Sequence, residues 1–288
     1  MGFEHINGKL YSLKIDFSGI YVIVYLYKGK HNILIDSAMN SFDIDSFVIP
    51  SLSELGISIN DIDILLNTHT HGDHIGGHYR LKELNPNIKV ITTELSKDKV
   101  ENPLKYNIEI RKAFPLDSPP PSYGLKGVHV DSIIKEGDLI ESLQVVFTPG
   151  HDDDCVSFYE LETKTLLTGD SIQQNGTNTQ GMALYMYLDQ YVDSLLKLQK
   201  MDIERIVAGH PFNPFGGDII GNKNVKEFIK YNIELVRKYD SIVSQNKDKD
   251  IHEIVRIIIK HFNGLIPEYL FLGLYTIREH LNKVKGDK

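Results

Sequence analysis

The sequence predicts an α/β protein that ends in a helical extension, and three observations support this prediction. Short segments rich in Val, Ile and Tyr, typical of strands, alternate with longer segments whose apolar residues have helical spacing. Four of the strand-like segments lead into a His or Asp side chain. After residue 221 the pattern changes to three successive helices. We therefore expect one domain at residues 1–221 and a helical extension or cap at residues 222–288.

The N-terminal half alternates between strand and helix patterns. Residues 9–15, 21–28 and 31–37 predict a β-meander with an apolar inner face. Further strands are expected at residues 62–66 and 89–93, and helices at residues 41–56, 74–84 and 94–113. Pro50 is expected to bend or break the first of these helices, whereas Gly76 and Gly77 allow the second to approach the sheet closely.

Two segments of the middle region lack this alternation. Residues 115–127 break all periodicity, and the three consecutive prolines at residues 119–121 make the segment stiff and extended. Residues 171–181 are polar and predict a flexible loop, after which helical spacing begins at Leu184. The three C-terminal helices are expected at residues 222–244, 250–262 and 267–285.

The stretch with the clearest chemical content is residues 62–77, where an apolar run ends in three histidines and an aspartate within six positions. The run has the length of a buried strand, and the polar side chains after it suit zinc and similar first-row ions. If the backbone stays extended, successive side chains alternate in direction. One metal could then take His69 and His71 while a second takes Asp73 and His74.

Three later segments supply the further ligands that a two-metal site needs. Each is an apolar strand pattern followed by a ligand-type residue, and these residues are His151, Asp170 and His210. The ordered set is HTHGDH, then His, Asp and His. With this set the sequence resembles the metallo-β-lactamase superfamily of binuclear metallohydrolases over residues 10–215.

The resemblance implies both a fold and a site. The fold would be a four-layer αββα sandwich of two mixed β-sheets. The first metal would be held by His69, His71 and His151. The second metal would be held by Asp73, His74 and His210, with Asp170 bridging the two. Both would be divalent, with Zn²⁺ expected and Fe or Mn as alternatives. Asp36 resembles the family's structural aspartate, and we expect it to cap backbone donors near the metal loop.

The resemblance also implies a reaction. Water between two divalent cations loses a proton near neutral pH, because a bound Zn²⁺ alone lowers its pKa to about 7. The metal-bridging hydroxide would attack a carbonyl, thioester or phosphoryl centre. Asp73 and Asp170 are the expected catalytic residues, since they keep the net charge of the site low and orient the hydroxide. The expected function is hydrolysis of a small-molecule ester-type bond, either a thioester or a lactone.

Three tyrosines are candidate substrate contacts. Tyr123 lies in residues 115–127, a place where this family often has one wall of the active site, although a surface connector is an equal alternative. Tyr185 and Tyr187 follow the polar loop, where a hydroxyl could steady a carbonyl oxygen or the ring could simply pack. The acidic run at residues 152–154 is either a hydrogen-bonded turn with partly exposed carboxylates or a feature that disfavours anionic substrates.

Composition limits the partners and the compartment. The 288 residues are 41% hydrophobic and 24% charged, which is ordinary for a soluble globular protein. Lys+Arg of 31 against Asp+Glu of 39 gives a net charge of −8, which disfavours a nucleic-acid partner. One cysteine excludes an internal disulfide, and neither a signal peptide nor an apolar run of the ~18 residues that span a membrane is evident. We expect a cytoplasmic enzyme with a small-molecule substrate, and its C-terminal helices either cap the site or form a homodimer.

Other functions remain as alternatives. An iron-dependent redox enzyme of the same fold, such as a persulfide dioxygenase, would differ in metal content and would consume oxygen. A phosphodiesterase or nuclease is disfavoured by the acidic balance, and a β-lactam hydrolase by the lack of an export signal. A non-catalytic binding module predicts a missing ligand, and none of the expected set is missing.

Overall fold

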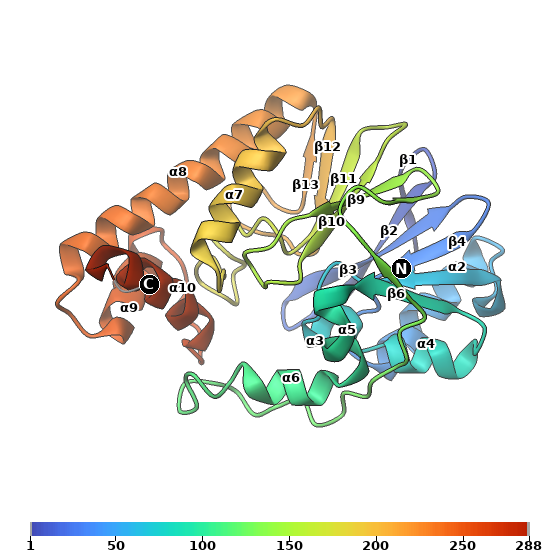
Figure 1. Ribbon diagram of the computed structural model, residues 1–288, viewed down its shortest axis with the longest axis horizontal. Helices are drawn as coiled ribbons and strands as arrows, with labels where there is room; N and C mark the ends of the chain where they lie inside the picture. Colours follow the sequence, from blue (N-terminus) through green and yellow to red (C-terminus); the bar gives the residue numbers. More distant parts are fainter. Residues whose placement is uncertain (1, 287–288) are drawn as a thin grey trace.

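The computed structural model describes residues 2–286 and shows two β-sheets packed against each other, with helices on both outer faces (Figure 1). Between the sheets lies an apolar core to which both contribute, for example Tyr25 and Leu66 from one sheet and Phe158 and Val207 from the other. Each outer face has a second apolar cluster where helices pack on the sheet. The expected four-layer αββα sandwich is therefore confirmed.

The first sheet has seven strands in chain order, antiparallel from the first to the fourth and parallel from the fourth to the seventh. The expected N-terminal β-meander is thus present. The strands are β1 (Glu4–Asn7), β2 (Leu10–Phe17), β3 (Ile20–Lys28), β4 (Asn32–Ile35), β5 (Ile62–Leu66), β6 (Lys89–Thr93) and β7 (Ser132–Ile134).

The second sheet has six strands in the order β13-β12-β11-β10-β9-β8. Its pairs are antiparallel except for β11 with β12, which are parallel. The strands are β8 (Leu139–Ile140), β9 (Leu143–Phe147), β10 (Val156–Glu160), β11 (Thr165–Gly169), β12 (Arg205–Ala208) and β13 (Asp218–Ile220).

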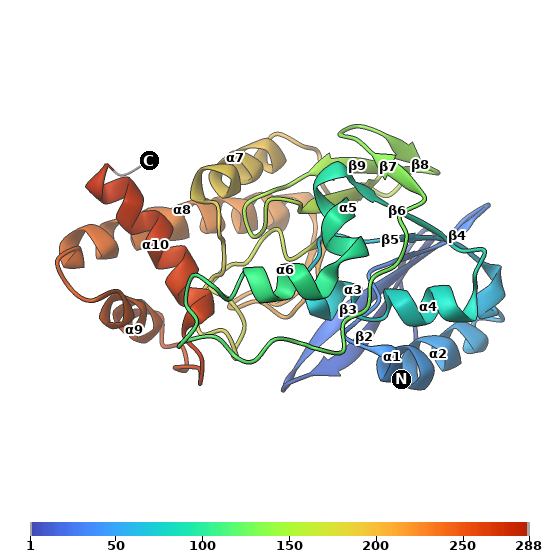
Figure 2. The ribbon, with the colours of Figure 1, turned by 60° about the horizontal axis from the view of Figure 1, so that its bottom comes forward.

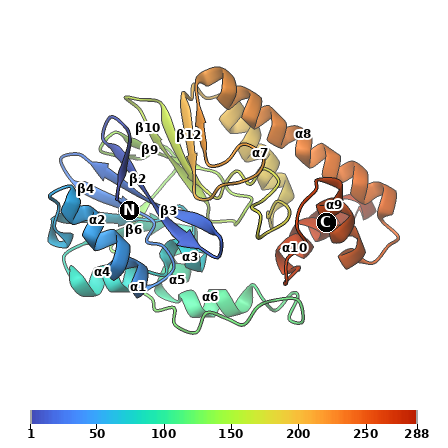
Figure 3. The ribbon, with the colours of Figure 1, turned by 180° about the vertical axis from the view of Figure 1, so that it is seen from behind.

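Helices from the first half of the chain cover the first sheet or lie at its end, as the view in Figure 2 shows. They are α1 (Ser41–Asp43), the π-helical segment η1 (Ile44–Val48), α2 (Ile49–Glu54), the 3₁₀ segment η2 (Ile59–Asp61), α3 (Gly72–Ile75), α4 (His78–Leu84), α5 (Glu94–Glu101) and α6 (Pro103–Glu109). The second sheet is covered by α7 (Leu188–Gln199) and by the long helix α8 (Asn222–Asn246) (Figure 3). Beyond them pack α9 (Ile251–His261) and α10 (Phe271–Lys285).

The boundaries of three expected helices need correction. The helix at residues 41–56 continues past Pro50, which lies in the first turn of α2 directly after the π-helical segment, where proline is tolerated. The helix expected at residues 74–84 is split at Gly76 and Gly77 into α3 and α4. A Cβ at Gly76 would lie 1.7 Å from the carbonyl oxygen of Met39, so only glycine fits this close approach. The helix expected at residues 94–113 is divided at Asn102, which precedes a proline and has φ −133°.

Residues 171–181 form a packed loop instead of a flexible one. The amide of Gln174 donates to Oδ1 of Asn232 at 2.9 Å, and the hydroxyl of Tyr239 donates to Oδ1 of Asn175 at 2.7 Å. The long helix α8 therefore fixes this loop, and the helical pattern expected from Leu184 begins only with α7 at Leu188.

An apolar stripe at and near the start of α10, formed by Tyr269, Leu270, Leu272, Leu274 and Ile277, packs largely inside the chain. Leu270, Leu274 and Ile277 are at most 6% exposed and pack with α7, α8 and α9. Tyr269 is 37% exposed and Leu272 is partly buried, and a homodimer through the C-terminal helices stays a prediction. Among the described residues no helix is both long and apolar enough to cross a membrane.

Candidate metal centre

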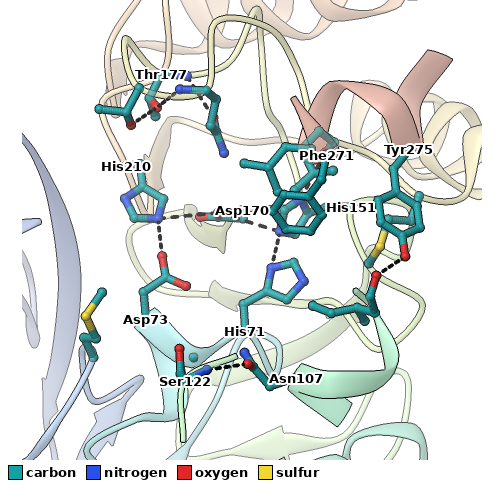
Figure 4. Close-up of a pocket in the computed structure, with 18 of the residues that line it drawn as sticks. His71, Asp73, Asn107, Ser122, His151, Asp170, Thr177, His210, Phe271 and Tyr275 are labelled. Atoms are coloured by element: carbon teal, nitrogen blue, oxygen red, sulfur yellow. Dashed lines mark hydrogen bonds and ion pairs between the residues drawn. The ribbon is translucent and has the colours of Figure 1, made fainter. Parts of the chain in front are cut away.

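The ligand-type side chains follow strands that end at one edge of the two sheets. β5 ends at Leu66, and the turn after it carries the HTHGDH sequence up to α3. In the second sheet β9, β11 and β12 run in the same direction, because β10 is antiparallel to both β9 and β11 and β12 is parallel to β11. Each of them leads into one further residue, and these are His151, Asp170 and His210. Figure 4 shows these three around a common point with His71 and Asp73.

The seven side chains form two groups of ligand-type atoms. The first group consists of His69, His71 and His151, and the second of Asp73, His74 and His210. Within each group the ligand atoms lie within 4.8 Å of one another. The Asp170 carboxylate lies between the groups, 3.5 Å from Nε2 of His74, 3.7 Å from Nε2 of His151 and 3.5 Å from Nε2 of His210. The structure thus brings together all seven residues that the sequence singled out.

Two of the histidines are oriented by hydrogen bonds to backbone carbonyls. Nδ1 of His151 lies 2.9 Å from the carbonyl oxygen of Leu184, and Nδ1 of His210 lies 2.7 Å from that of Tyr21. A carbonyl oxygen only accepts, so in each ring Nδ1 carries a proton and Nε2 faces the centre, where a cation could take its lone pair. This is the arrangement in which a neutral imidazole binds a metal.

Asp36, directly after β4, holds the base of the ligand turn. Its carboxylate accepts from the amide of Thr68 at 2.7 Å and from the Thr68 hydroxyl at 2.8 Å, and it lies 2.8 Å from Nδ1 of His74. The side chain is fully buried, so water does not compete for these bonds. The expected capping of backbone donors near the metal loop is confirmed.

A cation would satisfy several atoms of the centre that lack a hydrogen-bond partner. Nε2 of His69, Nε2 of His74 and Oδ1 of Asp170 are buried in this way. An unpaired buried polar group costs about 1–3 kcal/mol, so three of them at one point would be costly without a shared ligand. Imidazole and carboxylate are donors that Zn²⁺ and neighbouring first-row ions accept. The residues present therefore fit a metal centre.

The imidazoles and carboxylates shift one another's pKa. Burial, together with the neighbouring His151, lowers the pKa of His71 to about 4. For His74 burial acts in the same direction, but the surrounding carboxylates, Asp170 foremost, outweigh it and raise the pKa to about 10. In the absence of metal His74 is consequently protonated at neutral pH, and a cation would replace this proton.

The acidic run at residues 152–154 does not make the cleft acidic. Nζ of Lys99, on α5, lies 3.1 Å from Asp152, 2.5 Å from Asp153 and 3.5 Å from Asp154. Asp152 and Asp154 are buried, and Asp153 is partly exposed. Of the two alternatives, the hydrogen-bonded turn is therefore the better description, and Lys99 pairs with all three carboxylates.

A cavity of about 270 Å³ opens onto the centre. Five of the seven ligand-type side chains face it, whereas His69 and His74 lie behind them. Its apolar lining comes from Ile20, Met39, Ile110, Leu125, Leu184, Met186, Phe271 and Leu272. Its other polar lining comes from Asn107, Arg111, Ser122, Thr177, Thr179, Gln180 and Tyr275.

The wall of the cavity combines two regions that are far apart in sequence. Residues 115–127 contribute Ser122, whose amide donates to Oδ1 of Asn107 at 2.8 Å. The start of α10 contributes Phe271 and Tyr275, and the Tyr275 hydroxyl donates to the carbonyl of Ile110. Both the proline-rich segment and the C-terminal helices thus cover the candidate centre, as a wall and as a cap.

None of the three candidate tyrosines lines this cavity. Tyr185 is 1% exposed and its hydroxyl lies 2.6 Å from Nε2 of His280, so it packs in the core. Tyr123 is 71% exposed and does not line the cavity, whereas its neighbour Ser122 does. Tyr187 lies on the outer surface at the start of α7. Their role as substrate contacts therefore stays a prediction, and residues of the neighbouring segments, such as Ser122 and Leu184, line the cavity instead.

Sequence reasoning missed the residues that shape the wall. Arg111 and Asn107 stand in a polar helical stretch, and Tyr275 stands in an apolar stripe, so no local pattern marks them. Tyr106 was also missed: its ring stacks on His71 with centroids 6.4 Å apart, and its hydroxyl donates to Asp152.

Comparison with known proteins agrees with this geometry. Residues 16–210 match the profile of the metallo-beta-lactamase superfamily. The chain is 29% identical over 181 residues to a hydroxyacylglutathione hydrolase of Francisella tularensis subsp. novicida, a match that covers 62% of this chain and 57% of that protein. It is 28% identical over 183 residues to an atrochrysone carboxyl ACP thioesterase of Claviceps purpurea, covering 63% of this chain and 47% of that protein. The chain thus spans about half the length of these curated relatives.

Among solved structures, the fold is similar to a metallo-beta-lactamase family protein of Thermus thermophilus. The TM-score is 0.76 at 21% sequence identity, and the match covers 96% of this chain and 94% of that one. At this identity the likeness concerns the fold, including its C-terminal helices.

Proposed function

The chain belongs to the metallo-beta-lactamase superfamily, and on this premise we propose that it is a binuclear metal-dependent hydrolase that cleaves a thioester bond of a small molecule. The observation that carries the proposal is the convergence of seven His and Asp side chains at the inner end of one cavity. His69, His71 and His151 would hold one cation, and Asp73, His74 and His210 the other. Asp170 would bridge them, with Zn²⁺ as the proposed metal because imidazole and carboxylate donors suit it.

Two bound cations would supply a water molecule of lowered pKa and an electrophile for the carbonyl oxygen. The protein's own residues orient and balance these charges. Asp73 is 20% exposed toward the cavity, where its carboxylate can take up the proton that the nucleophilic water releases. Asp170 is 4% exposed and lies close to three histidines, so it keeps the net charge of the centre low.

The choice of a thioester rests on relatives and on the cavity. A hydroxyacylglutathione hydrolase and an acyl-carrier-protein thioesterase, as named above, both act on acyl groups attached to a larger carrier. A cavity of about 270 Å³ fits an acyl group and leaves a large carrier outside. Lactones remain the second ester-type class to assay, since they present the same carbonyl chemistry.

Elemental analysis of the purified protein, followed by a panel of thioesters, lactones and phosphodiesters, tests the proposal. We expect close to two divalent ions per chain and turnover of thioesters above the other classes. An oxygen electrode run with the same preparation separates hydrolysis from iron-dependent oxidation. Turnover that persists in a metal-free preparation would contradict the mechanism.

We expect His71→Ala to lose most of the bound metal and to lower kcat/KM by at least about 100-fold, because one group of ligands is left with two members. The protein should stay folded, since His71 lies at the cavity surface and not in a core. Metal content, kcat/KM and circular dichroism check these points together. His129→Ala removes a histidine whose side chain is 77% exposed and serves as the matched control.

A further inference from the structure

Arg111 is a cation held in the cavity wall. It follows α6, and its guanidinium donates from Nε to the carbonyl of Pro119 at 2.9 Å and from Nη1 to the carbonyl of Asn107. The guanidinium carbon lies 5.8 Å from the centre of the Phe271 ring, which lines the same cavity. These contacts fix the orientation of the guanidinium, because Pro119, Asn107 and Phe271 come from three separate segments.

These contacts orient Arg111 without balancing its charge. Its acceptors are neutral carbonyls, and among residues 2–286 no Asp or Glu forms an ion pair with it. By contrast, Arg205 pairs with Asp218 at 2.6 Å. Burial lowers the pKa of Arg111, and no carboxylate reverses this shift, although a guanidinium stays protonated at any physiological pH. The wall thus carries a partly desolvated positive charge.

The guanidinium of Arg111 has more donors than its protein contacts use, because a guanidinium has five N–H donors in a planar fork. Two of them go to the carbonyls of Pro119 and Asn107, which leaves donors for a planar anion at the cavity. The acidic run at positions 152–154 is paired with Lys99, and the two carboxylates that line the cavity, Asp73 and Asp170, belong to the candidate metal centre. The surroundings of Arg111 therefore favour an anion that the substrate brings.

We propose that Arg111 binds a carboxylate on the acyl part of the substrate, so that the enzyme selects thioesters of short dicarboxylic acids. The proposal rests on the proposed function for the identity of the bond that is cleaved. The lining of one cavity includes five of the ligand-type side chains and Arg111, together with apolar side chains such as Leu125 and Phe271. A short hydrocarbon chain with an ionised end matches a lining that combines apolar side chains with one cation, and the cavity volume of about 270 Å³ suits a small acyl group.

A matched pair of substrates tests the proposal. The succinyl and succinamoyl thioesters of N-acetylcysteamine have nearly the same shape and differ in one carboxylate against one carboxamide. We expect the metal-loaded enzyme to prefer the succinyl thioester by at least about 10-fold in kcat/KM. Arg111→Gln should lower kcat/KM by about 10- to 100-fold for the succinyl thioester and by less than about 2-fold for the succinamoyl thioester, since a hydrogen-bonded charge pair is lost only in the first case.

The ratio of kcat/KM between the succinyl and succinamoyl thioesters distinguishes carboxylate recognition by Arg111 from a purely structural role. If Arg111 only tied Pro119 and Asn107 together, its loss would lower both rates by the same factor, and the proposal would be overturned. Arg111→Lys keeps the charge without the planar fork and should restore part of the preference. Arg256→Gln removes one exposed arginine outside the cavity and should leave both rates unchanged.

A binding measurement keeps this test separate from the proposed function. Succinate should raise the melting temperature of the wild-type protein and not that of Arg111→Gln, whether or not any thioester is hydrolysed. If the metal-loaded enzyme cleaves neither thioester but succinate still protects through Arg111, the proposed reaction fails and the anion site stands. If inorganic phosphate protects and succinate does not, or if neither does, the assignment to a carboxylate is wrong.

Discussion

At the scale of single residues, Asp36 shows how one carboxylate outside the ligand set can determine the geometry of the centre. It is fully buried and accepts from both the amide and the hydroxyl of Thr68, the residue before the ligand turn. It also lies 2.8 Å from Nδ1 of His74, so it fixes the ring orientation of that histidine. Such outer hydrogen bonds govern metal affinity nearly as strongly as the ligands themselves.

We expect Asp36→Asn to weaken metal binding by about 10- to 100-fold, because the amide of asparagine cannot accept from Thr68 and His74 together. Competition with a chromophoric chelator measures this change. Asp16→Asn, an exposed position on β2, is the matched control. An Asp36 variant with unchanged affinity would show that the turn is held by other contacts.

At the scale of elements, the proline-rich segment and the C-terminal helices hold each other over the cavity. Nε2 of His252, on α9, lies 3.0 Å from both carboxylate oxygens of Asp117. Phe114 contacts the Tyr275 ring edge-to-face with centroids 5.3 Å apart. The wall therefore has one charged and one aromatic contact between segments separated by more than a hundred residues in sequence.

The charged contact should make the stability of the wall depend on pH. The hydrogen bond with Asp117 raises the pKa of His252 above its ordinary value of 6.5. A group with a raised pKa in the folded state stabilises the fold fully below its unfolded pKa, and this stabilisation is lost as the pH rises through the folded pKa.

We therefore expect His252→Asn to lower the melting temperature by up to about 2 °C at pH 5.5 and to have no effect at pH 9, as is usual for a partly exposed ion pair. Thermal unfolding at the two pH values checks this. If the variant melts at an equally lowered temperature at pH 5.5 and at pH 9, His252 acts through packing alone.

At the scale of the whole molecule, metal binding, protonation and stability should be linked. A metal that binds the folded chain raises its stability, and ligands that carry protons must release them first. The carboxylates around His74 raise its pKa to about 10, so in the metal-free protein this ring is protonated at pH 7.

Calorimetric titration of the metal-free protein with Zn²⁺ at pH 7 should therefore show release of about one proton or more per chain, from the dependence of the heat on the buffer. The loaded protein should also melt at a higher temperature than the metal-free one. Binding without proton release would mean that His74 is neutral before the metal arrives.

The metal centre was predictable from the sequence because each of its residues is marked by the residues directly before it. Each ligand-type residue follows an apolar strand pattern, as Asp170 follows β11, and parallel strands end at the same edge whatever the details of packing. The two-sheet sandwich followed from the family resemblance that these residues carry, and not from strand patterns alone.

The cavity wall was not predictable, because it depends on contacts between residues that are far apart in the sequence. Tyr185 and Tyr187 are neighbours of the centre in sequence, but one packs against His280 and the other faces outward. The run at residues 152–154 forms its ion pairs with Lys99, more than fifty positions earlier, and Arg111 depends on the packing of α10. The direction of each side chain and its pairing with distant residues determine these features. Neither leaves a periodic pattern in the sequence.

The separate origin of the centre and of its cap has a consequence for how selectivity can change. All seven ligand-type residues lie between positions 69 and 210, whereas Phe271, Leu272 and Tyr275 come from the last helix. Replacing that helix with one from another member of the superfamily should change the cap over the cavity and leave the seven ligand-type residues in place. Such a chimaera should catalyse the reaction of this protein and prefer the substrates of the protein that supplied the helix.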